Sequence, residues 1–249
     1  MGNFSHFTKE PVDLQDNYPF ECQKCGKCCK HRNDVLLNGR DVWALAGLFR
    51  ISTEEFIKKY CLVYIGKSSR IPVVTLRPVG KALICPFLHE NLCLVQEAKP
   101  TVCLLYPLGR MIRNEMLKEG EFKNPKVEYF EQSCRREIEN PDEKKKAPAW
   151  WEEENEHTVE AWLKRMGVEH PDSFFVSWTN MICRLCIKVI RLEKETPPGT
   201  IHRVWDLLFS AMYLWYKPDS PFEEQFVANM IIIDEFVKQV EEECSKYHN

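Results

Sequence analysis

The segment Cys22-Gln-Lys-Cys25-Gly-Lys-Cys28-Cys29 places four cysteines within eight residues. Each Cys-x2-Cys step lets a tight turn direct two sulfur atoms towards one centre, which is a geometry that metal–thiolate sites use. Gly26 follows Cys25 at a point where a positive φ, or a close approach of the backbone to a metal, requires a residue without a Cβ. The segment therefore predicts a thiolate-bound metal centre.

A second block of cysteines follows far downstream. It consists of Cys85, which Pro86 follows directly, then Cys93 and Cys103, and Cys134 lies beyond it. Seven or eight thiols exceed what one four-coordinate ion uses. We therefore expect the two blocks to converge on a shared inorganic centre. The predicted metal ligands are Cys22, Cys25, Cys28, Cys29, Cys85, Cys93 and Cys103, with Cys134 as an optional member.

The adjacent pair Cys28 and Cys29 needs separate treatment. Neighbouring side chains diverge by about 100° on a helix and point to opposite faces of a strand. We therefore expect that the two thiols do not bind one small tetrahedral ion together. Either they serve two centres, or one is a ligand while the other packs or stays in reserve.

Three kinds of bonding could hold the thiols together: an iron–sulfur cluster, a single metal ion or disulfides. The Cys-x2-Cys-x2-Cys triplet with a remote Cys-Pro is similar to the bacterial ferredoxin pattern, which favours a 4Fe–4S cluster, although Cys85-Pro86 lies much further downstream than in ferredoxins. Zinc or mononuclear iron is the alternative cofactor, because such ions take four nitrogen or sulfur ligands. Disulfides are disfavoured, since a reducing cytosol keeps thiols free and this chain is long enough to form a core without them.

Composition and charge limit the partners. The chain has 249 residues and a formal net charge of −3, and its Lys and Arg residues are scattered, so no basic patch for nucleic acid is indicated. The N-terminus lacks the apolar core of a signal peptide, and the apolar window 226–240 is too short and too charged to span a bilayer. We expect a cytoplasmic chain without nucleic-acid or membrane binding, whose protein partner, if it has one, the sequence does not identify.

The front of the chain combines short helices with irregular structure. Apolar residues at helical spacing predict a helix over 39–49, and Ser52 with Glu55 forms a capping-box pattern for a second helix that ends near Tyr60. The β-branched stretch Arg70–Arg77 predicts a short strand, which Pro72 is expected to keep out of a sheet interior.

The back of the chain is predicted to be helical. The expected helices cover 156–166, 173–192, 201–216 and 222–243. Short connections between antiparallel helices favour a bundle. The predicted fold class is mainly α, with an irregular Cys-rich front followed by a helical bundle. Its predicted parts are a cysteine-cluster domain (18–138), a connector (139–154) and a helical region (155–249).

These motifs resemble the YkgJ-type CxxCxxCC family of zinc- or iron-chelating domains. The similarity consists of the first cysteine run, an Asp41-led helix, a capped helix with a Phe and a Tyr, and a second block, which in this chain reads Cys85-Pro-Phe-Leu88, Cys93, Lys99-Pro-Thr-Val-Cys103 and Tyr106-Pro107. Two positions depart from the family, because Lys99 replaces the usual Arg and Leu104 replaces a basic residue.

The resemblance implies metal binding by these cysteines but no particular activity. A redox or cluster-assisted role is the function we favour, and a structural zinc-binding interaction module is an alternative. One branch of the family contains flagellin lysine methylases, so the metal-bearing part of a protein lysine methyltransferase is a further alternative. The back half carries no Gly-rich methyl-donor motif. Whether the protein is catalytic stays open.

Overall fold

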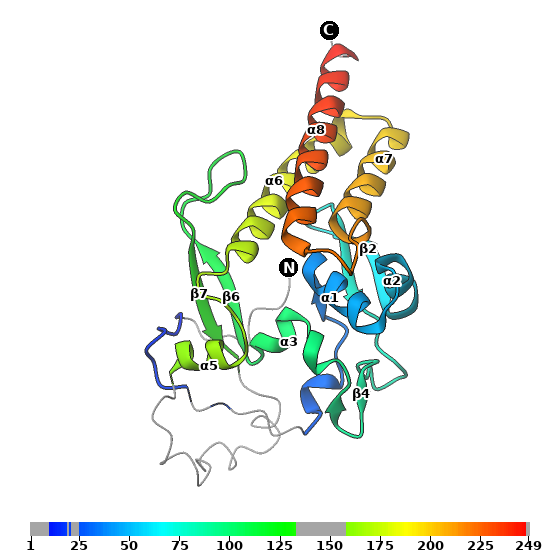
Figure 1. The fold of residues 1–249 in the computed structure, drawn as a ribbon. Coiled ribbons are helices and arrows are strands. Elements are labelled where there is room, and N and C mark those ends of the chain that lie inside the picture. The colour runs from blue at the N-terminus through cyan, green and yellow to red at the C-terminus, as the bar shows by residue number, and fades with distance from the viewer. Residues whose placement is uncertain (1–9, 19, 21–24, 133–157, 248–249) are drawn as a thin grey trace.

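The computed structural model describes residues 10–18, 20, 25–132 and 158–247. Figure 1 shows the long helices of the back of the chain side by side in one half, with short helices and strands beneath them. The front elements are η2 (Lys27–Cys29), β1 (Leu36–Leu37), α1 (Gly39–Phe49), α2 (Thr53–Tyr60), β2 (Cys61–Ile65), β3 (Pro72–Leu76), β4 (Leu88–His89), β5 (Leu92–Cys93), η3 (Gln96–Ala98), α3 (Thr101–Leu105), β6 (Leu108–Arg113) and β7 (Lys126–Glu131). The back elements are α5 (Val159–Arg165), α6 (Ser173–Glu195), α7 (Pro198–Phe209), η6 (Ser210–Leu214) and α8 (Phe222–Tyr247).

Helices α1 and α2 lie where the sequence predicts them. Asn38 caps α1 in a reciprocal capping box: its side chain accepts from the Asp41 amide at 2.8 Å, and the Asp41 carboxylate accepts from the Asn38 amide at 3.1 Å. Ser52 begins α2 by accepting a 3.1 Å hydrogen bond from the Glu55 amide, which is one half of the predicted box.

The strand around Pro72 is more central than predicted. Strands β1, β3 and β2 form an antiparallel sheet in that order, so the expectation that Pro72 excludes β3 from a sheet interior is wrong. Pro72 is the first residue of β3 and pairs only with Ile65 of β2, because β1 reaches no further than Val74. A proline without an amide hydrogen is tolerated at such a strand start.

An antiparallel pair, β6 and β7, adds strand content that the sequence pattern did not predict. Its buried residues Leu108, Val127 and Tyr129 join Trp162 and Leu163 of α5 in a small hydrophobic cluster. Figure 1 shows this pair beside the start of α6, with α5 at its foot. The mainly α prediction is therefore right in outline, while the irregular front contains more strand than expected.

The predicted back helices are present with shifted ends. Helix α7 begins at Pro198, where the ring's fixed φ suits the first helical turn, and it continues into the π-helical turn η6. Helix α8 runs to Tyr247. Their buried faces share one large cluster with α1, α2 and β3, in which Leu45, Val74 and Leu185 are fully buried. The domain limits stay predictions, and the predicted connector 139–154 lies outside the described residues.

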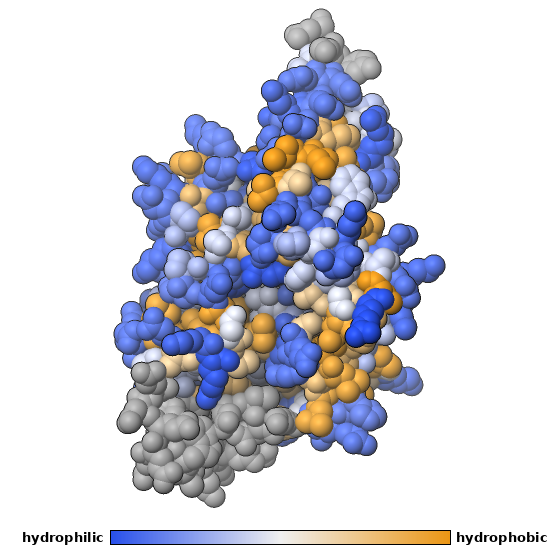
Figure 2. All heavy atoms as spheres, viewed as in Figure 1, coloured by the Kyte–Doolittle hydropathy of each residue, from blue (hydrophilic) through white to orange (hydrophobic). Residues whose placement is uncertain are grey.

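Hydrophobic side chains are exposed in several places. Figure 2 shows hydrophobic residues over α8 and around β4 on the visible face. Exposed apolar residues of α8 include Val227 and Ile231, and Leu92 and Leu94 are exposed beside β5. Among the described residues, α6 is the helix long and apolar enough to cross a membrane by length and composition, rather than the window 226–240. Its apolar face packs in the large cluster through residues such as Met181 and Leu185.

Candidate metal centre

Main-chain hydrogen bonds hold the two cysteine blocks together. The Cys85 amide donates to the Cys29 carbonyl at 2.8 Å. Next to it, the His31 amide donates to the Ala82 carbonyl at 2.9 Å, and the Arg32 amide donates to the Leu83 carbonyl at 3.2 Å. Segments that are far apart in the sequence are therefore adjacent, as the cysteine pattern predicts.

Gly26 gives the first block its turn. It has a φ of +70°, in the left-handed region that side chains disfavour, and it starts the η2 turn that carries Cys28 and Cys29. A Cβ at this position would lie 2.8 Å from Oδ1 of Asn91. The predicted need for a residue without a Cβ is confirmed, and the close neighbour is the loop that leads to Cys93.

The second block presents its cysteines from three local structures. A turn at Cys85 is closed by the Leu88 amide, which donates to the Cys85 carbonyl at 3.1 Å. Strands β4 and β5 place Cys93 opposite Leu88. Cys103 lies on the short helix α3, where its amide donates to the Pro100 carbonyl at 2.8 Å.

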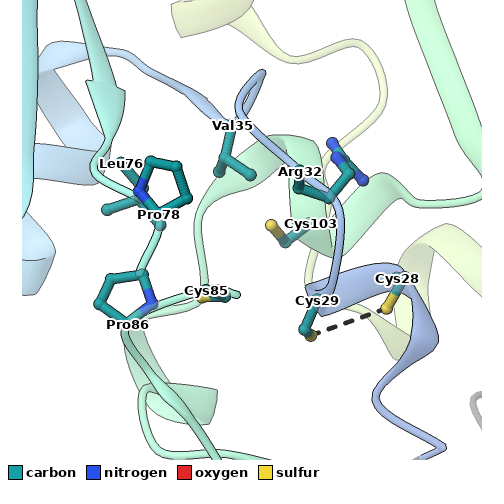
Figure 3. A pocket seen from close by; sticks show the side chains of 9 residues that line it. All are labelled: Cys28, Cys29, Arg32, Val35, Leu76, Pro78, Cys85, Pro86 and Cys103. Carbon is teal, nitrogen blue, oxygen red and sulfur yellow. Dashed lines mark hydrogen bonds between the residues drawn. The ribbon is translucent and has the colours of Figure 1, made fainter. Parts of the chain in front are cut away.

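Five thiols line one hollow, which we call the thiol pocket. Its cysteines are Cys28, Cys29, Cys85, Cys93 and Cys103, in two adjoining cavities that share six lining residues. Figure 3 shows four of these side chains around the hollow, with prolines and Leu76 along the opposite wall. The other lining residues are Arg32, Val35, Leu76, Pro78, Pro86, Phe87, Val95, Lys99, Pro100 and Tyr106.

Cys28 and Cys29 lie closer together than predicted. Their Sγ atoms are 3.8 Å apart, so the expectation that the two side chains diverge is wrong. The direction of a Cα–Cβ bond does not fix the sulfur position, because each thiol rotates about one further torsion. Two thiolates on one tetrahedral zinc, at about 2.3 Å from the metal, are also separated by about 3.8 Å. The spacing of this pair therefore suits one small ion.

The thiols differ in their proton affinity. The hydrogen bond with Cys29, together with burial, raises the pKa of Cys28, whereas the same hydrogen bond lowers the pKa of Cys29. Of the two thiols, Cys28 therefore holds its proton more tightly than Cys29. Burial raises the pKa of Cys85, and it raises the pKa of Cys103 to about 12. A metal that binds here must displace protons from these groups.

Two positively charged side chains partly offset the energetic cost of removing these protons. Arg32 and Lys99 line the pocket, and the charge of each lowers the pKa of Cys28 and of Cys103, although burial outweighs it. The Arg32 guanidinium is mostly buried, is paired with Asp34 and lies 5.9 Å from the centre of the Tyr106 ring. Of the two family departures, Lys99 faces the pocket, and Leu104 packs against the β6–β7 cluster instead.

The remaining predicted ligands are placed as follows. Cys25 is half-buried and is not among the residues that line the thiol pocket. Cys22 and Cys134 lie outside the described residues. The sequence pattern gave no sign of the apolar wall formed by Leu76 and Pro78, because their position depends on the pairing of β3.

The chemistry of the donor set fits a metal that prefers sulfur. Thiolates select zinc and iron–sulfur centres over hard cations such as Mg²⁺. As the side chains lie, no three His, Cys, Asp or Glu residues of the described chain are close enough to share one ion. The five thiols therefore surround the hollow rather than meet at one point, apart from the pair Cys28 and Cys29.

Comparison with known proteins yields a family for this part of the chain. Residues 21–135 match the model of the CxxCxxCC family, described as "Putative zinc- or iron-chelating domain". No curated protein and no solved structure matches the chain. The matched segment contains both cysteine blocks and every residue of the thiol pocket. Residues 21–135 of this chain are therefore similar to the CxxCxxCC family, which is the family that their cysteine pattern resembles.

Proposed function

We propose that the thiol pocket holds a 4Fe–4S cluster and that the protein has a redox or cluster-assisted role. The observation that carries this proposal is the convergence of five thiols from separate segments on one hollow. One zinc ion and one 4Fe–4S cluster each take four protein ligands, so it is the spread of the thiols and not their number that favours a cluster. A cluster of irons and sulfides is wider than one ion, so its thiolates lie around it, which is how these thiols are arranged.

The chain's own residues suit such a centre in charge and solvent exclusion. Arg32 and Lys99 offset the negative charge of several thiolates. Phe87 and Pro86 limit the access of water, which with hydrogen bonding sets the reduction potential of a thiolate-bound centre. A bound cluster would supply one-electron transfer.

Anaerobic purification followed by elemental analysis tests the proposal. We expect brown protein with broad absorption near 400 nm and about four irons per chain. Cys29→Ser and Cys103→Ser should each lose most of the iron. Cys186→Ser is the matched control, because Cys186 is a half-buried thiol on α6 outside the pocket, and it should retain the iron. Protein that purifies without iron and fails to incorporate it from iron and sulfide contradicts the proposal.

The spacing of Cys28 and Cys29 favours a second candidate, a mononuclear zinc or iron site in a structural module. Their 3.8 Å separation equals the edge of a zinc–thiolate tetrahedron, at about 3.8 Å. In this case the purified protein contains one metal per chain and no inorganic sulfide. The zinc form is colourless. Sulfide analysis separates the two candidates, since only the cluster contains it.

A further inference from the structure

The buried carboxyl group of Asp41 joins two helix starts. Asp41 is 5% exposed. Its Oδ2 accepts the hydrogen bond from Asn38 that completes the cap of α1. Its Oδ1 accepts from the Thr101 amide at 2.9 Å and from the Thr101 hydroxyl at 2.8 Å. One carboxylate thus satisfies donors of α1 and of α3.

The second set of hydrogen bonds is not needed to cap α1. The Asn38 contacts alone complete the capping box. Burial disfavours a charged carboxylate and raises the pKa of Asp41, while the hydrogen bonds from Thr101 and Asn38 oppose that shift. A buried charge is retained only where such bonds compensate it. The extra bonds therefore attach α3 to α1 at a defined position.

Helix α3 depends on such an attachment. It has five residues, Thr101–Leu105, and a helix this short does not form on its own in water. Cys103 lies in its first turn, two residues after the one that Asp41 holds. The positions of the Cys103 backbone and Cβ therefore follow from the position of Thr101.

We propose that Asp41 is a positioning residue for the metal centre, which acts by fixing Cys103 in the thiol pocket through Thr101. This inference rests on the proposed function, and it assigns to Asp41 a role in metal binding in addition to capping α1. Groups that orient metal ligands in this way typically change metal affinity by about 10–100-fold when they are replaced.

The test measures the rate at which EDTA removes the bound metal from the purified full-length chain. Asp41→Asn keeps the size of the side chain but replaces one acceptor oxygen by a donor, and we expect it to release metal about 10–100-fold faster than wild type. Thr101→Val, which removes only the hydroxyl bond, should show a smaller effect, and Thr101→Ser should restore wild-type release. Thr101→Val keeps the proposal testable if Asp41→Asn fails to fold.

Asp172→Asn is the matched control. Asp172 is likewise a buried carboxylate at a helix start, since it caps α6 by accepting from the Phe175 amide at 3.1 Å, but the cysteines of α6 do not line the thiol pocket. It should lower stability without changing the rate of metal release. In a Cys103→Ala background, Asp41→Asn should not lower the remaining metal content any further, because the ligand that it positions is already gone.

Alkylation of the loaded protein by iodoacetamide, read by peptide mass spectrometry, gives a residue-specific result. We expect Cys103 and Cys29 to be protected in wild type, and Cys103 alone to become reactive in Asp41→Asn. Equal protection and equal metal release in wild type and Asp41→Asn would show that Asp41 only caps α1, and would overturn this inference alone. Wild-type protein that binds no metal overturns the proposed function as well.

Discussion

The Cys85 amide donates a 2.8 Å hydrogen bond to the Cys29 carbonyl, so the main chain itself joins the two cysteine blocks. Flanking hydrogen bonds from His31 and Arg32 to the 82–83 segment extend this connection. The geometry of the thiol pocket is therefore partly set by backbone contacts and does not depend on a metal alone. This distinguishes the pocket from classical zinc fingers, which are unfolded without metal.

Metal removal should consequently lower stability without unfolding the chain. We expect EDTA treatment to leave the helical circular dichroism nearly unchanged, because the large cluster shared by α1, α6, α7 and α8 contains no predicted metal ligand among its fully buried residues. The melting temperature should fall, since a ligand at 100 times its Kd adds about 2.7 kcal/mol to stability. Complete loss of ellipticity on chelation would contradict this expectation.

Gly26→Ala should weaken both folding and metal binding. A side chain at a φ of +70° costs about 1–2 kcal/mol, and the new Cβ would lie 2.8 Å from Oδ1 of Asn91. Gly80→Ala is the control, because Gly80 has a similar φ of +67° but nothing within 4 Å of its Cβ position. Urea unfolding should show the larger loss for Gly26→Ala. Equal losses would mean that the contact with Asn91 is relieved without cost.

Local signals in the sequence predict part of this structure well. The helices over 39–49 and 53–60 follow from caps and apolar spacing, which act between neighbouring residues. The central place of Pro72 and the β6–β7 pair did not follow, because strand pairing joins segments whose partners no local pattern reveals.

The candidate site also has features that the sequence predicts and features that it does not. The convergence of the two cysteine blocks could be predicted, because clustered thiols in one chain indicate a shared metal centre. The closeness of Cys28 and Cys29 could not, since it depends on side-chain torsions within an irregular turn. Asp41 stands out in the sequence only as part of a motif, and its bonds to Thr101 require the tertiary structure.

Arg32→Met should shift metal binding to higher pH. The Arg32 charge lowers the pKa of Cys28 and Cys103, which burial and the contact with Cys29 raise. Without this charge the thiolates form at higher pH, so the pH of half-maximal metal uptake should rise and affinity at neutral pH should fall. Arg32→Lys keeps the charge and should shift the midpoint less. Arg113→Met, at an exposed position on β6, should leave it unchanged. An unchanged midpoint in Arg32→Met would exclude this role.

Phe87→Ala should accelerate metal loss as well as destabilise the fold. Phe87 is 2% exposed, lines the thiol pocket and packs against Tyr60 with ring centres 5.1 Å apart. Its removal should cost about 3–5 kcal/mol and open the pocket to water. Phe56→Ala removes a buried ring of the same aromatic group that is not among the residues lining the pocket. It should cost similar stability in urea unfolding, with little change in the rate of metal release to EDTA. Equal release rates for the two variants would show that Phe87 does not protect the metal centre from loss.

The buried pair Arg110 and Asp172 should make stability depend on acid pH. Burial raises the pKa of Asp172, but Arg110 at 2.8 Å, the Phe175 amide and Arg40 together outweigh it and hold that pKa below its ordinary value. The resulting stability is fully present above the ordinary carboxyl pKa of about 4, and it is lost as the pH falls through the lower folded value.

Asp172→Asn should cost about 3 kcal/mol at pH 7, because it leaves the Arg110 charge buried without its partner. Its urea-unfolding free energy should also change less than that of wild type between pH 5 and pH 2.5. Adding Arg110→Met should recover part of the loss at pH 7, since no unpaired charge then remains. A wild type and an Asp172→Asn variant with parallel pH profiles would show that another carboxylate controls acid unfolding.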